Sequence, residues 1–181
     1  MLFDPACYGP EVEALLALDG AGQRLLPLVS RACSSEEARS ILKTKSANNL
    51  FSGSYAPQAA LSGLWLYFSC FDESHNALQD IETPDCSYWH GIVHRQEPDA
   101  GNAAYWFRQV GDHPVFPLLR ESAEKLTTPQ FKLKERWDPF AFIDFCEEAR
   151  RQPGTETGGA AREIQRVEWQ LLFDHCARPR R

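Results

Sequence analysis

The residue types best suited to chemistry gather in one stretch of this chain, between Tyr88 and Pro114. Three of the five histidines lie in it, together with two tryptophans, two arginines and three carboxylates. Imidazole and carboxyl groups serve as general acids, general bases and metal ligands. This concentration predicts a functional site in the segment, but it does not specify a reaction.

The spacing of these residues predicts two short helices that meet at Pro98. His90 and His94 are four residues apart, so on a helix they share one side and border the apolar face. Pro98 disfavours helical backbone at the residue before it, and the first helix should therefore end near residue 96 or 97. Asp99 can then cap a second helix that ends at Gly111. Such a corner would bring together His90, His94, Glu97, Asp99 and Asn102.

A histidine pair with this spacing can hold a divalent metal ion. The candidate metal ligands are His90, His94 and Glu97, and Asp99 or His113 could also complete the set. The segment lacks the His-Glu-x-x-His order of zinc hydrolases. The alternative is that these histidines lie on the surface or are hydrogen-bonded in the core.

In the catalytic interpretation a histidine acts as general base or metal ligand, a carboxylate assists it, and an arginine neutralises an anionic substrate. The candidate catalytic residues are His90, His94, Glu97, Asp99 and Glu168. The candidate substrate-binding residues are Arg95, Asn102, Tyr105, Trp106, Arg108 and His113. Structural roles are the alternative: a helix cap for Asp99, ion pairs for the arginines with Glu97 and Asp112, and core positions for the aromatic side chains.

Glu168 is a candidate because it falls inside the apolar stripe of the last predicted helix, residues 160–176. A lone buried carboxylate is costly, so Glu168 should have a partner. Arg95 or Arg108 would make an ion pair that orients two helices. A site histidine would instead give Glu168 a part in the chemistry.

A set of short matches runs through residues 89–114: Trp89-His90-Gly91, His94-Arg95, Glu97-Pro98-Asp99, Asn102-Ala103, Tyr105-Trp106-Phe107-Arg108, Val110-Gly111 and His113-Pro114. This run resembles the signature stretch of a family of uncharacterised microbial proteins. Weaker echoes occur over residues 137–140 and 168–173. The resemblance implies a shared fold and no catalytic assignment, because no activity is established for that family.

Length and composition indicate one compact domain over residues 1–181. The chain is 43% hydrophobic and 12% aromatic, and a domain of this size buries roughly 70% of its unfolded surface. The formal net charge of -6 gives no overall attraction to nucleic acid. The longest apolar run, residues 59–71, is shorter than the roughly 20 residues of a membrane span. We therefore expect neither nucleic acid nor a membrane as partner.

The cysteines and the N-terminus favour a cytoplasmic protein. The cysteines at positions 7, 33, 70, 86, 146 and 176 form no close pair, and we expect reduced core thiols rather than a disulfide frame. Residues 1–5 lack the charged and apolar regions of a signal peptide.

Helix signals dominate the rest of the chain and predict an all-α, irregular bundle. Its centre should be an apolar helix over about residues 57–71, after which Asp72, Glu73 and His75 are expected at a solvated helix end rather than in a metal site. A Ser34–Glu37 capping box predicts a helix over residues 36–43. Further helices are predicted over residues 10–18, 23–31, 115–126 and from 139 onward. Loops are predicted over residues 44–56 and 152–159, and the second of these is expected to be mobile. The alternation near residues 130–134 also fits a short edge strand.

Two functions fit these features. One is a small helical enzyme or ligand receptor whose pocket, formed by the two site helices and the last helix, binds a small anionic molecule or a divalent metal. Hydrolysis or elimination suits its residues better than redox chemistry, since no dinucleotide or flavin fingerprint is present. The other is a noncatalytic interaction module, in which the same polar residues fix the Pro98 corner and an aromatic surface binds another protein.

Overall fold

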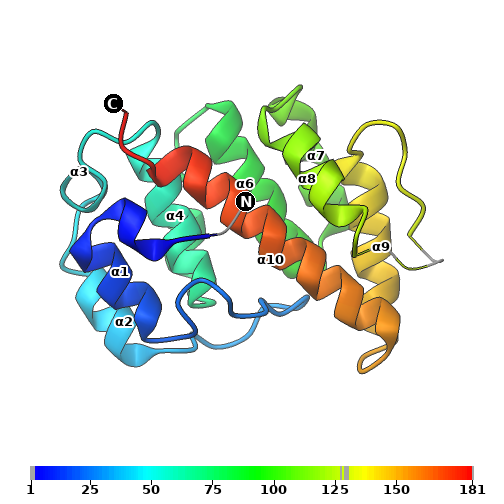
Figure 1. The fold of residues 1–181 in the computed structure, drawn as a ribbon, viewed down its shortest axis with the longest axis horizontal. Coiled ribbons are helices and arrows are strands. Elements are labelled where there is room, and N and C mark those ends of the chain that lie inside the picture. The colour runs from blue at the N-terminus through cyan, green and yellow to red at the C-terminus, as the bar shows by residue number, and fades with distance from the viewer. Residues whose placement is uncertain (1–2, 127, 129–130, 181) are drawn as a thin grey trace.

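The computed structural model describes residues 3–126, 128 and 131–180, and over these residues the chain is an all-α bundle, as predicted. A short 3-10 helix, Pro5–Tyr8, comes first. The α-helices are α1 (Pro10–Ala17), α2 (Glu36–Leu42), α3 (Ala47–Leu50), α4 (Pro57–Tyr67), α5 (Phe71–Asn76), α6 (Pro84–Gln96), α7 (Ala100–Val110), α8 (Val115–Ala123), α9 (Pro139–Arg151) and α10 (Glu156–Ala177). Figure 1 shows α10 running diagonally across the bundle, with α1 and α2 toward one end and α9 toward the other.

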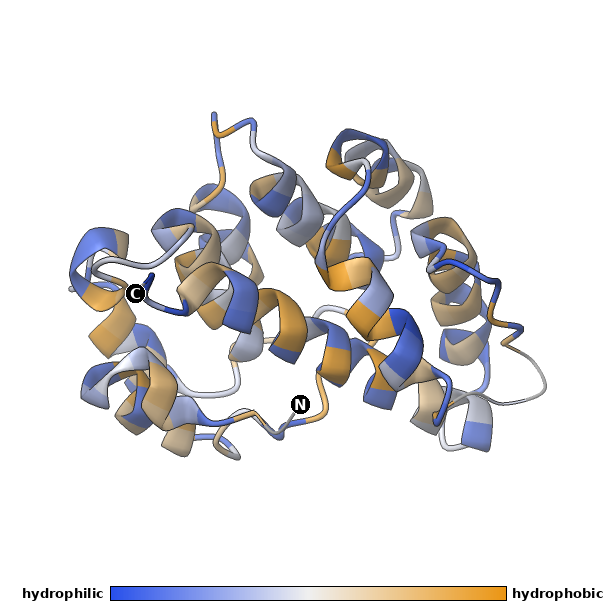
Figure 2. Cartoon of the chain, turned by 45° about the horizontal axis from the view of Figure 1, so that its top comes forward, coloured by the Kyte–Doolittle hydropathy of each residue, from blue (hydrophilic) through white to orange (hydrophobic). Residues whose placement is uncertain are grey.

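The buried helices α4 and α6 pack against each other and make the core, and α4 also packs against α10. Every residue of α4 from Ala59 to Tyr67 is buried, so the predicted apolar centre is confirmed for this part. Apolar bands recur along α10 in Figure 2, and its Trp169 Nε1 donates a 2.8 Å hydrogen bond to the Gly63 carbonyl. Gly63 also leaves room for the Trp89 ring of α6. Any other residue at this position would place its Cβ 2.5 Å from that ring, which is too close.

The helix α6 is as buried as α4, although it is far more polar. All of its residues from Asp85 to Gln96 are buried, including Asp85, His90, His94 and Arg95. Buried polar groups need partners, because losing water without a replacement hydrogen bond costs free energy. The partners of these four side chains therefore show what each one does.

The prediction of one continuous helix over residues 57–71 is wrong for its last turn. The helix α4 ends at Tyr67, Ser69 adopts a left-handed backbone with φ of 58°, and α5 begins at Phe71. Arg24 stabilises this break, because its guanidinium donates to the Tyr67 carbonyl and, at 3.1 Å, to the Ser69 hydroxyl. The break gives α5 a direction of its own, toward α6.

The predicted helix over residues 23–31 is also absent. Pro27 interrupts the segment, and the Gln165 amide of α10 donates to the Leu26 and Pro27 carbonyls at 3.2 and 3.0 Å. These backbone groups therefore find their partner across the core rather than along a helix.

Smaller corrections concern caps and loops. Ser35 rather than Ser34 caps α2, accepting from the Ala38 amide at 3.1 Å. The predicted loop over residues 44–56 contains α3, and Thr155 caps α10 so that residues 156–159 of the predicted mobile loop are helical. Residues 131–134 form no strand, so that prediction is wrong for these residues, and Phe131 instead stacks on Phe145 at 4.6 Å between ring centroids. Residue 130 of that prediction lies outside the described residues.

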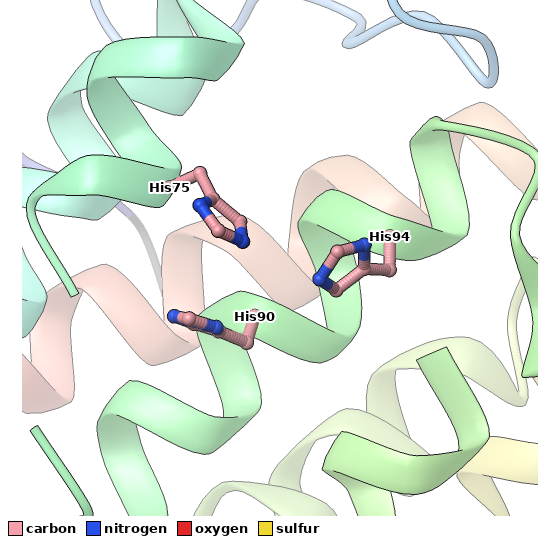
Figure 3. Close-up of side chains that lie close together, drawn as sticks. All are labelled: His75, His90 and His94. Atoms are coloured by element: carbon pink, nitrogen blue, oxygen red, sulfur yellow. The ribbon is translucent and has the colours of Figure 1, made fainter. Parts of the chain in front are cut away.

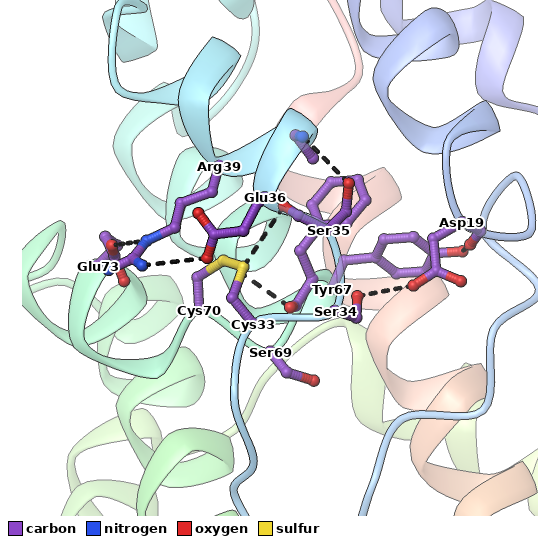
Figure 4. The surroundings of a disulfide bond; sticks show 12 residues. Asp19, Cys33, Ser34, Ser35, Glu36, Arg39, Tyr67, Ser69, Cys70 and Glu73 are labelled. Atoms are coloured by element: carbon purple, nitrogen blue, oxygen red, sulfur yellow. Dashed lines mark hydrogen bonds and ion pairs between the residues drawn. A yellow bond between two sulfur atoms is a disulfide. The ribbon is translucent and has the colours of Figure 1, made fainter.

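Cys33 and Cys70 form a disulfide, so the prediction that all six cysteines are reduced is wrong for these two. They are separated by 37 residues in sequence, but the Ser34 amide binds the Phe68 carbonyl at 2.7 Å and brings the two segments together (Figure 4). Cys7, Cys86, Cys146 and Cys176 are free. The disulfide removes one argument for a cytoplasmic location, since such bonds persist mainly in oxidising compartments.

Candidate metal centre

The corner at Pro98 forms as the sequence predicted. Glu97 ends α6, and the Asp99 side chain caps α7 by accepting from the Asn102 amide at 3.0 Å. The Asp99 amide in turn donates to the His94 carbonyl at 3.0 Å. These bonds give Asp99 the role of a helix cap.

His94 lies at the centre of this corner. Its Nδ1 is 2.9 Å from a carboxylate oxygen of Glu97, and the Asn102 amide nitrogen is 3.3 Å from both ring nitrogens. A carboxylate that accepts from Nδ1–H fixes the ring orientation and leaves Nε2 with its lone pair. Glu97 can therefore orient His94 rather than compete with it for a ligand.

A third histidine joins this pair from α5. The His75 ring centroid lies 4.8 Å from that of His90 and 5.3 Å from that of His94. One nitrogen of each ring falls in a group whose members all lie within 4.8 Å of one another, and Figure 3 shows the rings converging between α5 and α6. We call His75, His90 and His94 the three-histidine cluster. His75 lies in the last turn of α5 and is half-buried, as expected for a helix end, but its packing on His90 and His94 was not predicted. Its neighbour Glu73 does pair outward, with Arg39 at 2.6 Å.

His90 has the least satisfied environment in the cluster. The residue is 4% exposed, and neither ring nitrogen has a hydrogen-bond partner among the residues the structure describes. The Trp106 ring covers it at 4.1 Å between centroids. Burial lowers the pKa of His90 to about 4, and the neighbouring His75 and His94 add to the effect. Burial also lowers the pKa of His94, against the opposing influence of Glu97. Both rings are thus neutral near pH 7 and can donate lone pairs to a metal.

A polar hollow of about 540 Å³ lies on the other side of Glu97, whose side chain contacts His94. Its wall also includes Asp72 and Glu73 at the start of α5, Arg39, and both cysteines of the disulfide. None of His75, His90 and His94 lines the hollow, and Glu97 is the residue of its wall that contacts the cluster.

A second cluster contains Asp85, His113 and His175, which come from the start of α6, the turn before α8 and the end of α10; we call it the Asp85 cluster. One oxygen of Asp85 lies 3.2 Å from His113 Nε2 and 3.1 Å from His175 Nε2. The Val115 amide donates to His113 Nδ1 at 3.3 Å, which leaves the proton of the neutral ring on Nε2, facing Asp85. Burial raises the pKa of the Asp85 carboxyl, but the hydrogen bonds from both histidines outweigh burial and hold this pKa well below its usual range.

Sequence reasoning chose His113 but missed Asp85 and His175. Asp85 follows Pro84 at a helix start, where an acidic residue needs no further explanation. His175 has a recognisable signal, because it interrupts the apolar stripe of α10.

Glu168 and Arg95 bind each other. Both side chains are fully buried, and the guanidinium contacts both carboxylate oxygens. The Tyr88 hydroxyl donates to Glu168 at 3.2 Å, and Arg95 donates to Gln165 at 3.3 Å. The ion pair that the sequence offered as one alternative is confirmed, and it joins α6 to α10.

The remaining candidates are dispersed. Tyr105 is 52% exposed on α7, whereas Trp106 covers His90. Arg108 lies over the Phe140 ring at 5.9 Å and, together with His113, lines a cavity of about 1090 Å³ that includes none of the three-histidine cluster.

No family model, curated protein or solved structure matches this chain. No helix in the described part of the chain is long and apolar enough to cross a bilayer.

Proposed function

We propose that this protein binds a divalent transition metal, with Zn²⁺ the best fit, through His75, His90 and His94, and uses it for hydrolysis or elimination on a small substrate. The observation that carries the proposal is the burial of His90 beside two other imidazoles with both of its nitrogens unpartnered. A buried polar ring without a partner is costly, and a shared cation would give one of its two nitrogens a partner.

The donor set fits zinc chemistry. Imidazole suits zinc, and catalytic zinc sites use three protein ligands and leave the fourth position to water or substrate. Tetrahedral zinc with bonds of roughly 2.0 Å places its nitrogen ligands about 3.3 Å apart. The nitrogens here lie within 4.8 Å, so small side-chain rotations close the set.

Three neutral ligands leave the full charge of the metal to act on bound water, whose pKa such a centre lowers to about 7. Glu97 holds His94 in place and also lines the polar hollow, so it is the link between the cluster and that hollow. This arrangement supports attack by hydroxide on a carbonyl or phosphoryl group.

The test is the metal content of purified full-length protein, measured by plasma mass spectrometry after exposure to zinc and desalting. We expect about one zinc per chain, lost in His75→Ala, His90→Ala and His94→Ala. The matched control is His175→Ala, which removes an imidazole from the Asp85 cluster and should retain the metal. A folded wild type that emerges free of zinc, or equal loss in the control, would contradict the proposal.

The second candidate function is a noncatalytic interaction module. The Asp85 cluster and the Arg95–Glu168 pair favour it, because their members satisfy one another without a ligand. It predicts that zinc binds no more tightly to the wild type than to His90→Ala.

A further inference from the structure

We infer that the 1090 Å³ cavity between α7, α8 and the segment before α9 is a second ligand site, and that it takes an aromatic carboxylic acid. Its size is slightly above the roughly 300–1,000 Å³ range of small-molecule sites. This inference is independent of the metal centre, because the cavity wall contains no residue of the three-histidine cluster.

The wall of the cavity supplies a place for a flat apolar body. Four aromatic side chains line it: Phe107, Phe116, Trp137 and Phe140. Aromatic rings favour a stacked or edge-on partner of the same kind. An aliphatic chain or a compact polar molecule would use this surface less well.

The charges on the wall single out Arg108. Three other cations also line it, but each has a partner: Arg136 binds Asp112 at 2.6 Å, Lys134 binds Asp138 at 2.6 Å, and Arg120 binds Glu124 at 3.2 Å. Arg108 has no carboxylate within ion-pair distance over the described residues, and the remaining acid on the wall, Glu135, makes no such pair with it. A free guanidinium is a two-pronged donor that suits a carboxylate.

The imidazole on the wall is already satisfied. Asp85 and the Val115 amide occupy both nitrogens of His113, so Arg108 is the group left to bind an anion.

The experiment is calorimetric titration of the full chain with 2-naphthoate and with its neutral counterpart, 2-naphthylmethanol. We expect saturable binding of one 2-naphthoate per chain and on the order of tenfold weaker binding of the alcohol. Arg108→Gln should weaken 2-naphthoate about tenfold and change the alcohol little.

Two control variants should bind 2-naphthoate like the wild type. Arg151→Gln removes an exposed cation at the end of α9, outside the cavity, and His94→Ala disrupts the metal centre. The inference is overturned if 2-naphthoate does not saturate, if the alcohol binds equally well, or if Arg151→Gln weakens binding as much as Arg108→Gln. Loss of binding in His94→Ala alone would place the acid at the metal centre and would also overturn it.

Discussion

Two clusters of ionisable side chains share the buried helix α6, and they differ in how their hydrogen bonds are used. In the Asp85 cluster one carboxylate accepts from two imidazoles, and a backbone amide fixes the proton of His113. In the three-histidine cluster His90 has no partner for either nitrogen over the described part of the chain. Similar residue types thus make a closed structural network in one place and an open donor set in the other. The comparison teaches that buried nitrogens without hydrogen-bond partners, rather than the mere presence of histidines, indicate where a ligand binds.

The largest loss of stability should come from breaking the buried Arg95–Glu168 ion pair. Glu168→Ala leaves the Arg95 charge fully buried and uncompensated, so we expect a loss of about 3–5 kcal/mol in unfolding free energy. Denaturant unfolding followed by circular dichroism measures it. The double variant Arg95→Met/Glu168→Leu should lose less than Glu168→Ala, since it removes both charges. Equal losses would show that the pair is not electrostatically coupled.

Lowering the pH should reduce the unfolding free energy through each cluster in a different pH range, and the larger loss should come from His90. Its pKa is lowered from 6.5 to about 4 in the folded protein, so the unfolded state binds more protons between these values and stability falls as pH falls from 6.5 to 4. The loss for the metal-free protein is on the order of 3 kcal/mol. Unfolding free energies of wild type and His90→Gln at several pH values measure it. A variant with the wild-type slope over this window would contradict the assignment.

Zinc should stabilise the protein only when the three-histidine cluster is intact. At a free concentration about one hundred times Kd, a ligand that binds the folded state adds about 2.7 kcal/mol. We expect a corresponding rise in the Tm of the wild type and of His175→Ala, and none in His90→Ala. Thermal unfolding with and without zinc provides the measurement, and a chelator should reverse the rise.

Asp85 should have a smaller effect in a different pH window. Asp85→Asn removes the charged acceptor of two imidazoles, and we expect a loss of about 1–3 kcal/mol at neutral pH. Because the folded pKa of Asp85 is depressed, its stabilisation is complete above about pH 4 and disappears as pH falls further. The variant should therefore converge on the wild type in acid. A constant difference down to pH 2 would assign the effect to packing.

The smallest effect should follow from replacing His90 by a residue of similar size without ring nitrogens. In metal-free protein at pH 7, His90→Leu should leave stability nearly unchanged or increase it, because it removes two unsatisfied polar atoms. A loss above about 2 kcal/mol would mean that His90 belongs to a structural network after all.

Local sequence patterns predicted much of the fold and, of the three-histidine cluster, the two members on α6. Proline, acidic caps and apolar spacing located most helices, and Pro98 with Asp99 located the corner that joins His94, Glu97 and Asn102. These signals can be read from sequence because caps and i,i+4 contacts act within a few residues.

The rest depends on the path of the chain. His75 reaches His90 only because the backbone breaks at Ser69, where Arg24 holds it from a distant segment. The break contradicts an apolar pattern that continues into α5, so no local rule reveals it.

By itself the sequence determined an all-α chain, the corner at Pro98 and the need of Glu168 for a partner, since these follow from backbone geometry and from the cost of burying charge. Only the tertiary structure decided which partner each buried group received: Arg95 for Glu168, two imidazoles for Asp85, and His75 for the pair on α6. The physical reason is that contacts between distant segments are fixed by how whole helices pack, and residue spacing carries no record of that packing.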